Sequence, residues 1–257
     1  MPFYSVNGRE LYYDITGSGT PVVLIHGFLG DSKTHFGKQM NDPSLNQNYT
    51  LIAPDLRGFG KSQIEKYAKW GEPHTANQLL EDIDILIKNL HINKDIIIGG
   101  YSVGGALALE YAKTHQDLIR GIFLISPRPF INEKGKSMPF LSKERRSSSN
   151  FIMRSSSNLM WGILKRWQKG SSHRWIKKKT KDQKLIEEFA LVKDIPTVLI
   201  YANKDSVTPQ IAFDVIKENI TNLEVIEFDG DHGILHEKPD EFNKAFKGWL
   251  DKVNHVN

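Results

Sequence analysis

The pentapeptide Gly-Tyr-Ser-Val-Gly at positions 100–104 constrains the fold of this chain more than any other segment. An apolar run at 96–98 precedes it and a helical pattern at 106–109 follows it, so the order is strand, tight turn, helix. A serine at such a turn projects its hydroxyl from the strand tip and adopts a strained backbone conformation. The two glycines let strand and helix approach closely. This context favours Ser102 as a nucleophile over an inert serine in a tight turn.

The rest of the chain alternates short β-branched runs with amphipathic stretches of helical length. The predicted strands are residues 3–6, 11–16, 22–25, 50–53, 95–99, 121–125, 197–201 and 223–228. The predicted helices are residues 75–90, 103–115, 209–219 and 239–253. Near-continuous apolar strands are typical of a buried parallel sheet, and Asn7-Gly8 predicts an antiparallel hairpin at the start. The sequence therefore predicts an α/β fold with a mostly parallel central sheet flanked by helices.

Residues 127–189 interrupt this alternation and are predicted to be a short helical insertion into a core formed by 1–126 and 190–257. The insertion contains no strand candidate, and apolar residues between Leu159 and Trp167 recur at helical spacing. Between Arg128 and Lys184 there are 16 Lys and Arg against 3 Asp and Glu, a balance of +13. The remaining 18 Lys and Arg and 27 Asp and Glu give −9, so the basic charge belongs to one segment.

A serine nucleophile needs a base that is itself oriented by a third group. His232 follows the predicted strand 223–228, and Asp205 follows the predicted strand 197–201. Open α/β sheets place their sites at the carboxyl ends of strands, so these two residues are the predicted base and acid. The alternative for Asp205 is a turn residue or a helix cap. Asp229 and Asp231 are poor orienters, because the acid must approach the ring from a separate loop.

The other histidines lie in less suitable contexts. His236 is the rival base, but the Glu-Lys-Pro that follows indicates that it leads into the last helix. Six further histidines are predicted to lie at the surface or to cap helices: His35, His74, His91, His115, His173 and His255.

The segment 24–30, Leu-Ile-His-Gly-Phe-Leu-Gly, ends another apolar strand. A glycine-containing loop at this place can present the backbone N–H of Phe28 beside that of Val103, which predicts a two-donor oxyanion hole. The alternative is an ordinary strand end with a hydrogen-bonded His26.

These residues together resemble the α/β-hydrolase superfamily over about 1–126 and 190–257. The motifs that carry the resemblance are the pentapeptide around Ser102, Asp-Leu-Arg-Gly-Phe-Gly-Lys-Ser at 55–62, Asp205 with 207–209, and His232 with Glu237 and Pro239. Asp231 departs from the pattern, since a small residue usually precedes the histidine. A serine at position 102 argues against the dehalogenase and epoxide hydrolase branches, which use aspartate there. The resemblance also implies that 127–189 is a cap over the site.

The resemblance implies a cofactor-free and metal-free serine hydrolase that acts on carboxylic esters, as a carboxylesterase does. Ser102, His232 and Asp205 would form the catalytic triad, with Phe28 and Val103 as oxyanion donors. The same triad in related families performs carbon–carbon bond hydrolysis, perhydrolysis, acyl transfer or the lyase chemistry of menaquinone synthesis. A catalytically silent ligand receptor on the same scaffold is the alternative from another class.

The composition excludes several kinds of chemistry and indicates where the protein is located and which partners it has. The 257 residues include no cysteine, which excludes disulfides, thiolate metal sites and a cysteine nucleophile. No secretory signal or apolar run long enough to span a membrane is recognisable, so we expect a soluble, cytoplasmic protein. The basic insertion is either a solvated face or a surface for an anionic or lipid-like ester substrate or an anionic membrane. No nucleic-acid motif is recognisable, and we expect no nucleic-acid partner.

Overall fold

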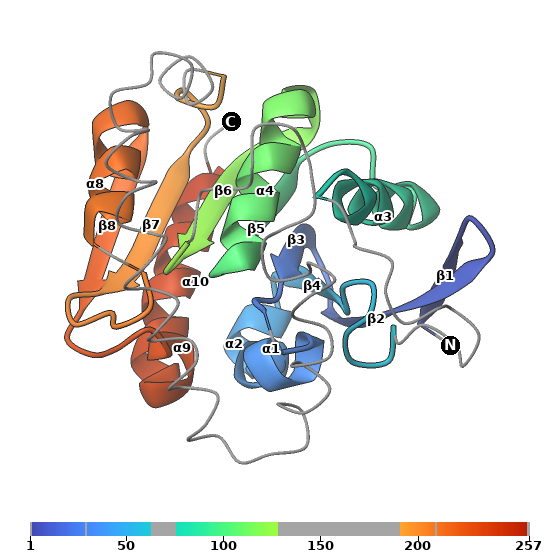
Figure 1. Ribbon diagram of the computed structural model, residues 1–257, viewed down its shortest axis with the longest axis horizontal. Coiled ribbons are helices and arrows are strands. Elements are labelled where there is room, and N and C mark those ends of the chain that lie inside the picture. Colours follow the sequence, from blue (N-terminus) through green and yellow to red (C-terminus); the bar gives the residue numbers. More distant parts are fainter. Residues whose placement is uncertain (1, 29, 63–75, 128–190, 209, 256–257) are drawn as a thin grey trace, which may run out of the picture.

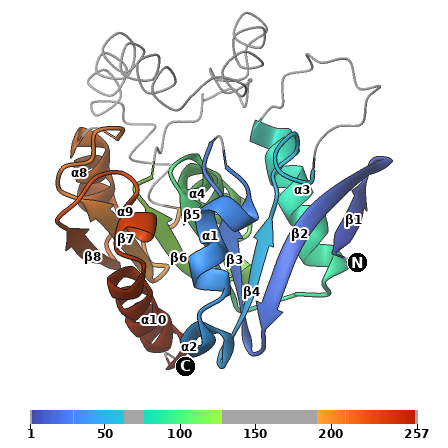
Figure 2. The same cartoon turned by 90° about the horizontal axis from the view of Figure 1, so that it is seen from below.

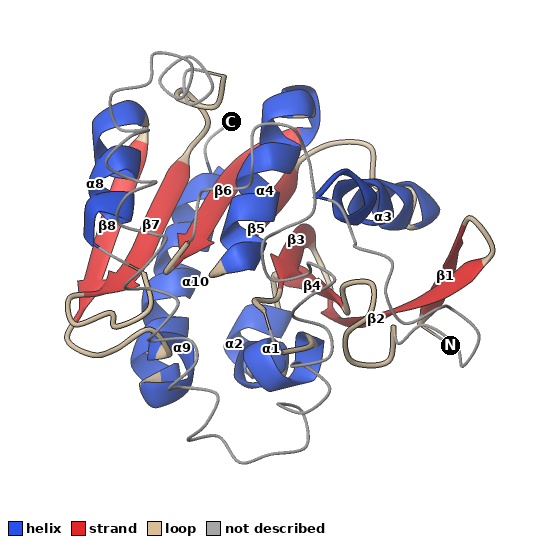
Figure 3. Ribbon diagram, in the orientation of Figure 1, coloured by secondary structure: helices blue, strands red, loops and turns tan. Residues whose placement is uncertain are grey.

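The computed structural model describes residues 2–28, 30–62, 76–127, 191–208 and 210–255 (Figure 1). The predicted cap at 127–189 therefore lies outside the described residues, apart from Pro127. The described parts form one sheet with helices on both of its faces (Figure 3).

Each of the eight predicted strands is present in the sheet. In chain order they are β1 (Phe3–Val6), β2 (Arg9–Gly17), β3 (Thr20–Ile25), β4 (Tyr49–Pro54), β5 (Ile96–Tyr101), β6 (Ile119–Ile125), β7 (Thr197–Ala202) and β8 (Leu223–Phe228). Their order in space is β1-β2-β4-β3-β5-β6-β7-β8, and the sheet runs from β1 at one edge to β8 at the other (Figure 2). Strand β2 pairs antiparallel with β1 and β4, whereas the pairs from β4 to β8 are parallel. The prediction of a mostly parallel sheet is confirmed.

The first two strands form the predicted hairpin. Val6 pairs with Arg9 across the turn, and Asn7 and Gly8 have φ values of 51° and 78°. Positive φ at both central positions is the geometry of a type I′ turn, which matches the twist of the strands it joins.

The described residues form the four predicted helices and three further α-helices that the periodicity did not reveal. The predicted helices appear as α3 (Ala76–Asn89), α4 (Val103–Thr114), α8 (Gln210–Asn219) and α10 (Pro239–His255). The additional helices are α1 (Ser32–Met40), α2 (Pro43–Asn46) and α9 (Ile234–Glu237). A capping box begins α1, in which the side chains of Asp31 and Thr34 bond each other's backbone N–H.

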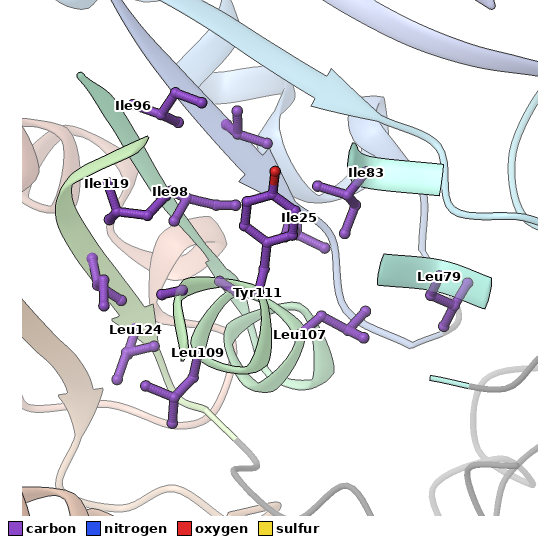
Figure 4. Close-up of a cluster of buried hydrophobic side chains, with 14 of the residues drawn as sticks. Ile25, Leu79, Ile83, Ile96, Ile98, Leu107, Leu109, Tyr111, Ile119 and Leu124 are labelled. Carbon is purple, nitrogen blue, oxygen red and sulfur yellow. The ribbon is translucent and has the colours of Figure 1, made fainter. Parts of the chain in front are cut away.

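The sheet separates two hydrophobic clusters. Val23 and Ile25 of β3 point into a cluster shared with α3, α4 and α8, in which Tyr111 packs among Ile25, Ile98 and other apolar side chains (Figure 4). Val22 and Leu24 point to the opposite face, where the cluster includes side chains of α1, α2, α9 and α10. Alternate residues of one strand thus serve two cores, which explains the uninterrupted apolar sequence of the central strands.

Candidate active site

The three predicted triad residues lie beyond the carboxyl ends of β5, β7 and β8. Ser102 follows β5 directly, Asp205 lies in the loop after β7, and His232 lies in the loop after β8. These strands are parallel, and β5 is separated from β7 only by β6. The loops therefore project from the same edge of the sheet, which is the edge where open α/β folds bind ligands.

Ser102 has the strained backbone that its motif predicts. Its φ is 55° and its ψ is −114°, and its hydroxyl makes no capping hydrogen bond to α4. The Ser102 N–H donates to the Ile125 carbonyl at 2.8 Å, which joins the turn to the end of β6. A Cβ added at Gly100 would lie 2.6 Å from the Gly104 carbonyl carbon, so the predicted close approach of strand and helix is confirmed. At either glycine an added Cβ would also overlap the Ile25 carbonyl oxygen of β3.

His232 and Asp205 form a buried hydrogen-bonded pair. His232 Nδ1 lies 2.8 Å from Asp205 Oδ2 and 3.0 Å from Oδ1. Oδ1 also accepts the backbone N–H groups of Val207 and Thr208, so the carboxylate is fixed from two sides. Because a carboxylate only accepts, Nδ1 carries the proton, and the lone pair of the neutral ring is at Nε2. This arrangement can accept a proton at Nε2 from a nearby hydroxyl.

Asp231 joins the two loops that carry this pair. One of its oxygens accepts the N–H of Ser206 and the N–H of His232, each at 2.7 Å, and the other accepts the Ser206 hydroxyl at 3.0 Å. Burial raises the pKa of Asp231, but the hydrogen bonds from Ser206 and His232 lower it more, and the net pKa is below its ordinary value. Asp231 therefore bonds the backbone of the loops and not the imidazole ring.

The loop after β3 lies against the serine. A Cβ on Gly27 would be 3.0 Å from the Tyr101 ring and 3.3 Å from the Ser102 Cβ. Val103 is the first residue of α4, where backbone N–H groups have no partner within the helix. The loop that contains the predicted oxyanion donor Phe28 thus lies beside Ser102, which directly precedes the other predicted donor, Val103.

His26 is fully buried at the end of β3. Its Nδ1 lies 2.7 Å from the Gly27 carbonyl oxygen, and its Nε2 accepts the Leu56 N–H at 2.9 Å. Nδ1 is therefore the protonated nitrogen. The ring is neutral because its Nε2 accepts a hydrogen bond, and burial lowers the pKa of His26. The ring thus connects the loop after β3 to the loop after β4.

Comparison with known proteins places this site in a family. The model of the alpha/beta hydrolase fold matches residues 20–147, which contain β3 to β6 and the turn at Ser102. The chain belongs to the α/β-hydrolase superfamily.

Its relatives in the superfamily include proteins of different activities. The AB hydrolase superfamily protein YisY of Bacillus subtilis is 25% identical over 261 residues, which cover 91% of this chain and 92% of YisY. The soluble epoxide hydrolase of a Corynebacterium species is 32% identical over 137 residues, which cover 52% of this chain and only 44% of that protein. An esterase from Thermogutta terrifontis shares the fold with a TM-score of 0.70, at 22% identity over 98% of this chain and 97% of the esterase.

The sequence-based assignment of His35 to the surface or a helix cap was wrong. His35 lies on α1, and its Nδ1 accepts the Gly27 N–H at 3.1 Å. Its ring packs against Tyr101 with centroids 5.0 Å apart, and Tyr101 in turn packs against His232 at 5.0 Å. Burial, together with the neighbouring His26 and His236, lowers the pKa of His35 to about 3. Helix α1 was not predicted, so nothing in the sequence indicated that His35 would contact the loop after β3.

The rival base His236 lies on α9, beside Tyr101 and His35. Among the described residues, no carboxylate hydrogen bonds to its ring. His74 and His173 lie outside the described residues, and His115 is the C-cap of α4 as expected.

No group of three or more described His, Asp and Glu side chains could hold a metal ion. None of the helices in the described part of the chain is long and apolar enough to cross a membrane.

Proposed function

We propose that this chain is a serine hydrolase that cleaves carboxylic esters through an acyl-enzyme. The observation that carries the proposal is the buried His232–Asp205 pair, whose imidazole lies 5.0 Å from the ring of Tyr101. Tyr101 directly precedes Ser102, which has a φ of 55° at a strand-to-helix turn. Such a pair holds the tautomer that a general base needs, and the turn presents the nucleophile.

In the proposed reaction, Ser102 Oγ attacks the acyl carbon while His232 Nε2 takes the hydroxyl proton. Asp205 keeps the ring in this tautomer and stabilises the imidazolium. The backbone N–H groups of Phe28 and Val103 bind the oxyanion of the tetrahedral intermediate. His232 then gives the proton to the leaving alcohol, and water activated by the same ring releases the acid.

Hydrolysis of p-nitrophenyl esters from acetate through octanoate to palmitate tests this proposal. We expect turnover in the intact chain and a loss on the order of 10⁴-fold in kcat for Ser102→Ala, because the nucleophile is then missing. Ser126→Ala is the matched control. This serine follows β6, also has a positive φ and is buried without a partner for its Oγ among the described residues, so we expect its removal to leave kcat within about threefold.

Two histidine variants test whether His232 or His236 is the general base. We expect His232→Gln to lose about as much activity as Ser102→Ala and His236→Gln to keep most of it. Ester turnover that survives Ser102→Ala would overturn the proposal. An absence of turnover on every ester would also overturn it, and would favour carbon–carbon hydrolysis, lyase chemistry or a silent receptor.

A further inference from the structure

Both backbone polar atoms of Gly27 are held by histidine side chains. The Gly27 N–H donates to His35 Nδ1, and the Gly27 carbonyl oxygen accepts from His26 Nδ1. In a planar trans peptide the carbonyl oxygen and the following N–H point in opposite directions. The bond from His26 therefore holds the peptide group that contains the Phe28 N–H, and the bond from His35 holds the peptide group before it. The direction of the Phe28 N–H depends on both bonds, because together they fix the two backbone torsions of Gly27.

We propose that His35 is a positioning residue that holds the Gly27 backbone so that the Phe28 N–H stays directed at the oxyanion. This inference rests on the proposed function. Glycine is the residue whose flanking peptide groups rotate most freely, so a glycine next to Phe28 needs an external constraint. Without the acceptor on His35, the Gly27 N–H would lose its partner inside the site, and the His26–Gly27 peptide group would turn to find another. That turn changes the torsions of Gly27 and moves the Phe28 N–H on its other side.

The surroundings of His35 fix its ring in the orientation that this bond requires. A Cβ on Gly30 would overlap the imidazole, so Gly30 leaves the space that the ring fills. Tyr101 packs edge-on against the ring, and the His236 ring lies 5.6 Å away. Because Nδ1 accepts a hydrogen bond, the ring must be neutral with its proton on Nε2. The His35 ring is thus a fixed hydrogen-bond acceptor for the Gly27 N–H.

Substitution of His35 by Asn and by Leu separates the effect of the hydrogen bond on kcat from the effect of side-chain packing. The Oδ1 of Asn is bonded to Cγ as Nδ1 of His is, so His35→Asn keeps an acceptor near the same place, whereas His35→Leu fills space without one. One oxyanion donor is worth roughly 10²- to 10³-fold in kcat. We expect His35→Leu to lower kcat on p-nitrophenyl esters by at least about 30-fold with KM within about threefold. We expect His35→Asn to recover most of this loss.

His115→Leu is the matched control, because His115 caps the far end of α4 and stacks on Tyr111. It should leave kcat unchanged, and circular dichroism of each variant should show the native fold. Wild-type kcat in His35→Leu would overturn the proposal. Equal losses in the Asn and Leu variants would also overturn it, because packing would then explain the effect.

A second measurement does not depend on turnover. Nitrogen-15 NMR of the imidazole should show an unprotonated, hydrogen-bonded Nδ1 and a protonated Nε2 on His35 in the intact chain at neutral pH. A proton on Nδ1 would overturn the proposal even if the esters are hydrolysed. If the NMR signature is as expected but no ester is cleaved, the proposed function fails and the assigned hydrogen bond stands.

Discussion

Two carboxylates lie near His232, and their hydrogen bonds give them different tasks. Asp205 bonds the ring at Nδ1, and its side chain is only 1% exposed, so it fixes both tautomer and ring orientation. Asp231 bonds the backbone of His232 and both the N–H and the hydroxyl of Ser206. One acid therefore orients the proposed base, and the other holds together the two loops from which acid and base project.

Removing the link between these loops should lower activity without removing a catalytic group. We expect Asp231→Ala to reduce kcat by up to about 100-fold, because displacing the base by about 1 Å has an effect of that size. Ser206→Ala is the matched control, since it loses only the 3.0 Å hydroxyl bond and keeps the backbone one. Steady-state kinetics on one ester should rank wild type and Ser206→Ala above Asp231→Ala. Equal kcat in all three proteins would contradict this role.

His35 should make stability depend on pH. Its pKa falls from 6.5 to about 3 on folding, so the unfolded chain binds the proton more readily. The contribution of the neutral ring is complete above the unfolded pKa of 6.5 and is lost as the pH falls toward about 3. From about pH 7 to about pH 5 this single group should remove about 2 kcal/mol from the free energy of unfolding.

Urea unfolding of wild type and His35→Asn at these two pH values checks the effect. The variant should lose less stability than wild type between them, because the titrating group is gone. An identical loss in both proteins would show that His35 does not stay neutral in the folded chain.

At the scale of elements, the contact between β3 and the β5–α4 turn is the tightest constraint on the site. A Cβ at Gly104 would overlap the Ile25 carbonyl oxygen and lie 2.7 Å from that of His26. Gly248 offers the opposite case, since it is an exposed glycine in the interior of α10 with nothing within 4 Å of an added Cβ.

The same substitution should therefore have opposite signs at these two glycines. We expect Gly104→Ala to lower the free energy of unfolding by more than about 3 kcal/mol, because backbone must move to admit the methyl group. Gly248→Ala should raise it by about 0.5–1 kcal/mol, since Ala favours the helix. Thermal or urea unfolding of the two variants measures both values. A stable Gly104→Ala protein with wild-type activity would contradict the described turn.

The sequence was most informative for elements whose own residues show a clear pattern of apolar and polar side chains. The central strands β3 to β7 are buried on both faces, so their apolar runs predicted them. All eight predicted strands match the observed ones within a few residues. Helix α1 lacked such a pattern, because it buries Phe36 and Met40 but also contains Gly37 and several polar residues. Helices α2 and α9 are four residues each, too short for periodicity to appear.

The same distinction applies to the candidate site. The position of a residue just past a strand end is a local property. Together with the motif around Ser102 and the chain order Ser, Asp, His, it led to Ser102, Asp205 and His232 as the candidates. The roles of His35 and Asp231 depend on side chains that reach across to another loop. No spacing along the chain indicates such contacts. The sequence therefore placed His35 at the surface or at a helix cap and predicted no link from Asp231 to Ser206.

At the scale of the whole molecule, charge is divided unevenly along the chain. The segment from Arg128 to Lys184, which lies outside the described residues, has a balance of +13 against −9 for the remainder. We propose that this segment attracts anionic substrates or an anionic lipid surface.

Salt should weaken that attraction. Between about 0.01 and 1 M salt the Debye length falls from about 30 to 3 Å, so turnover of an ester in anionic vesicles should drop strongly. Turnover of the same ester in zwitterionic vesicles is the control and should change little. Salt-insensitive kinetics on both surfaces would contradict the proposed role of the basic segment.

The central claim is that Ser102 is the nucleophile and that His232 activates it. The most direct measurement is mass spectrometry of the intact chain and its peptides after reaction with a fluorophosphonate, which bonds an activated serine. We predict one adduct, on the peptide that contains Ser102, no adduct in Ser102→Ala, and labelling at least about 100-fold slower in His232→Gln. An adduct on another residue, or none in the wild-type chain, would contradict the claim.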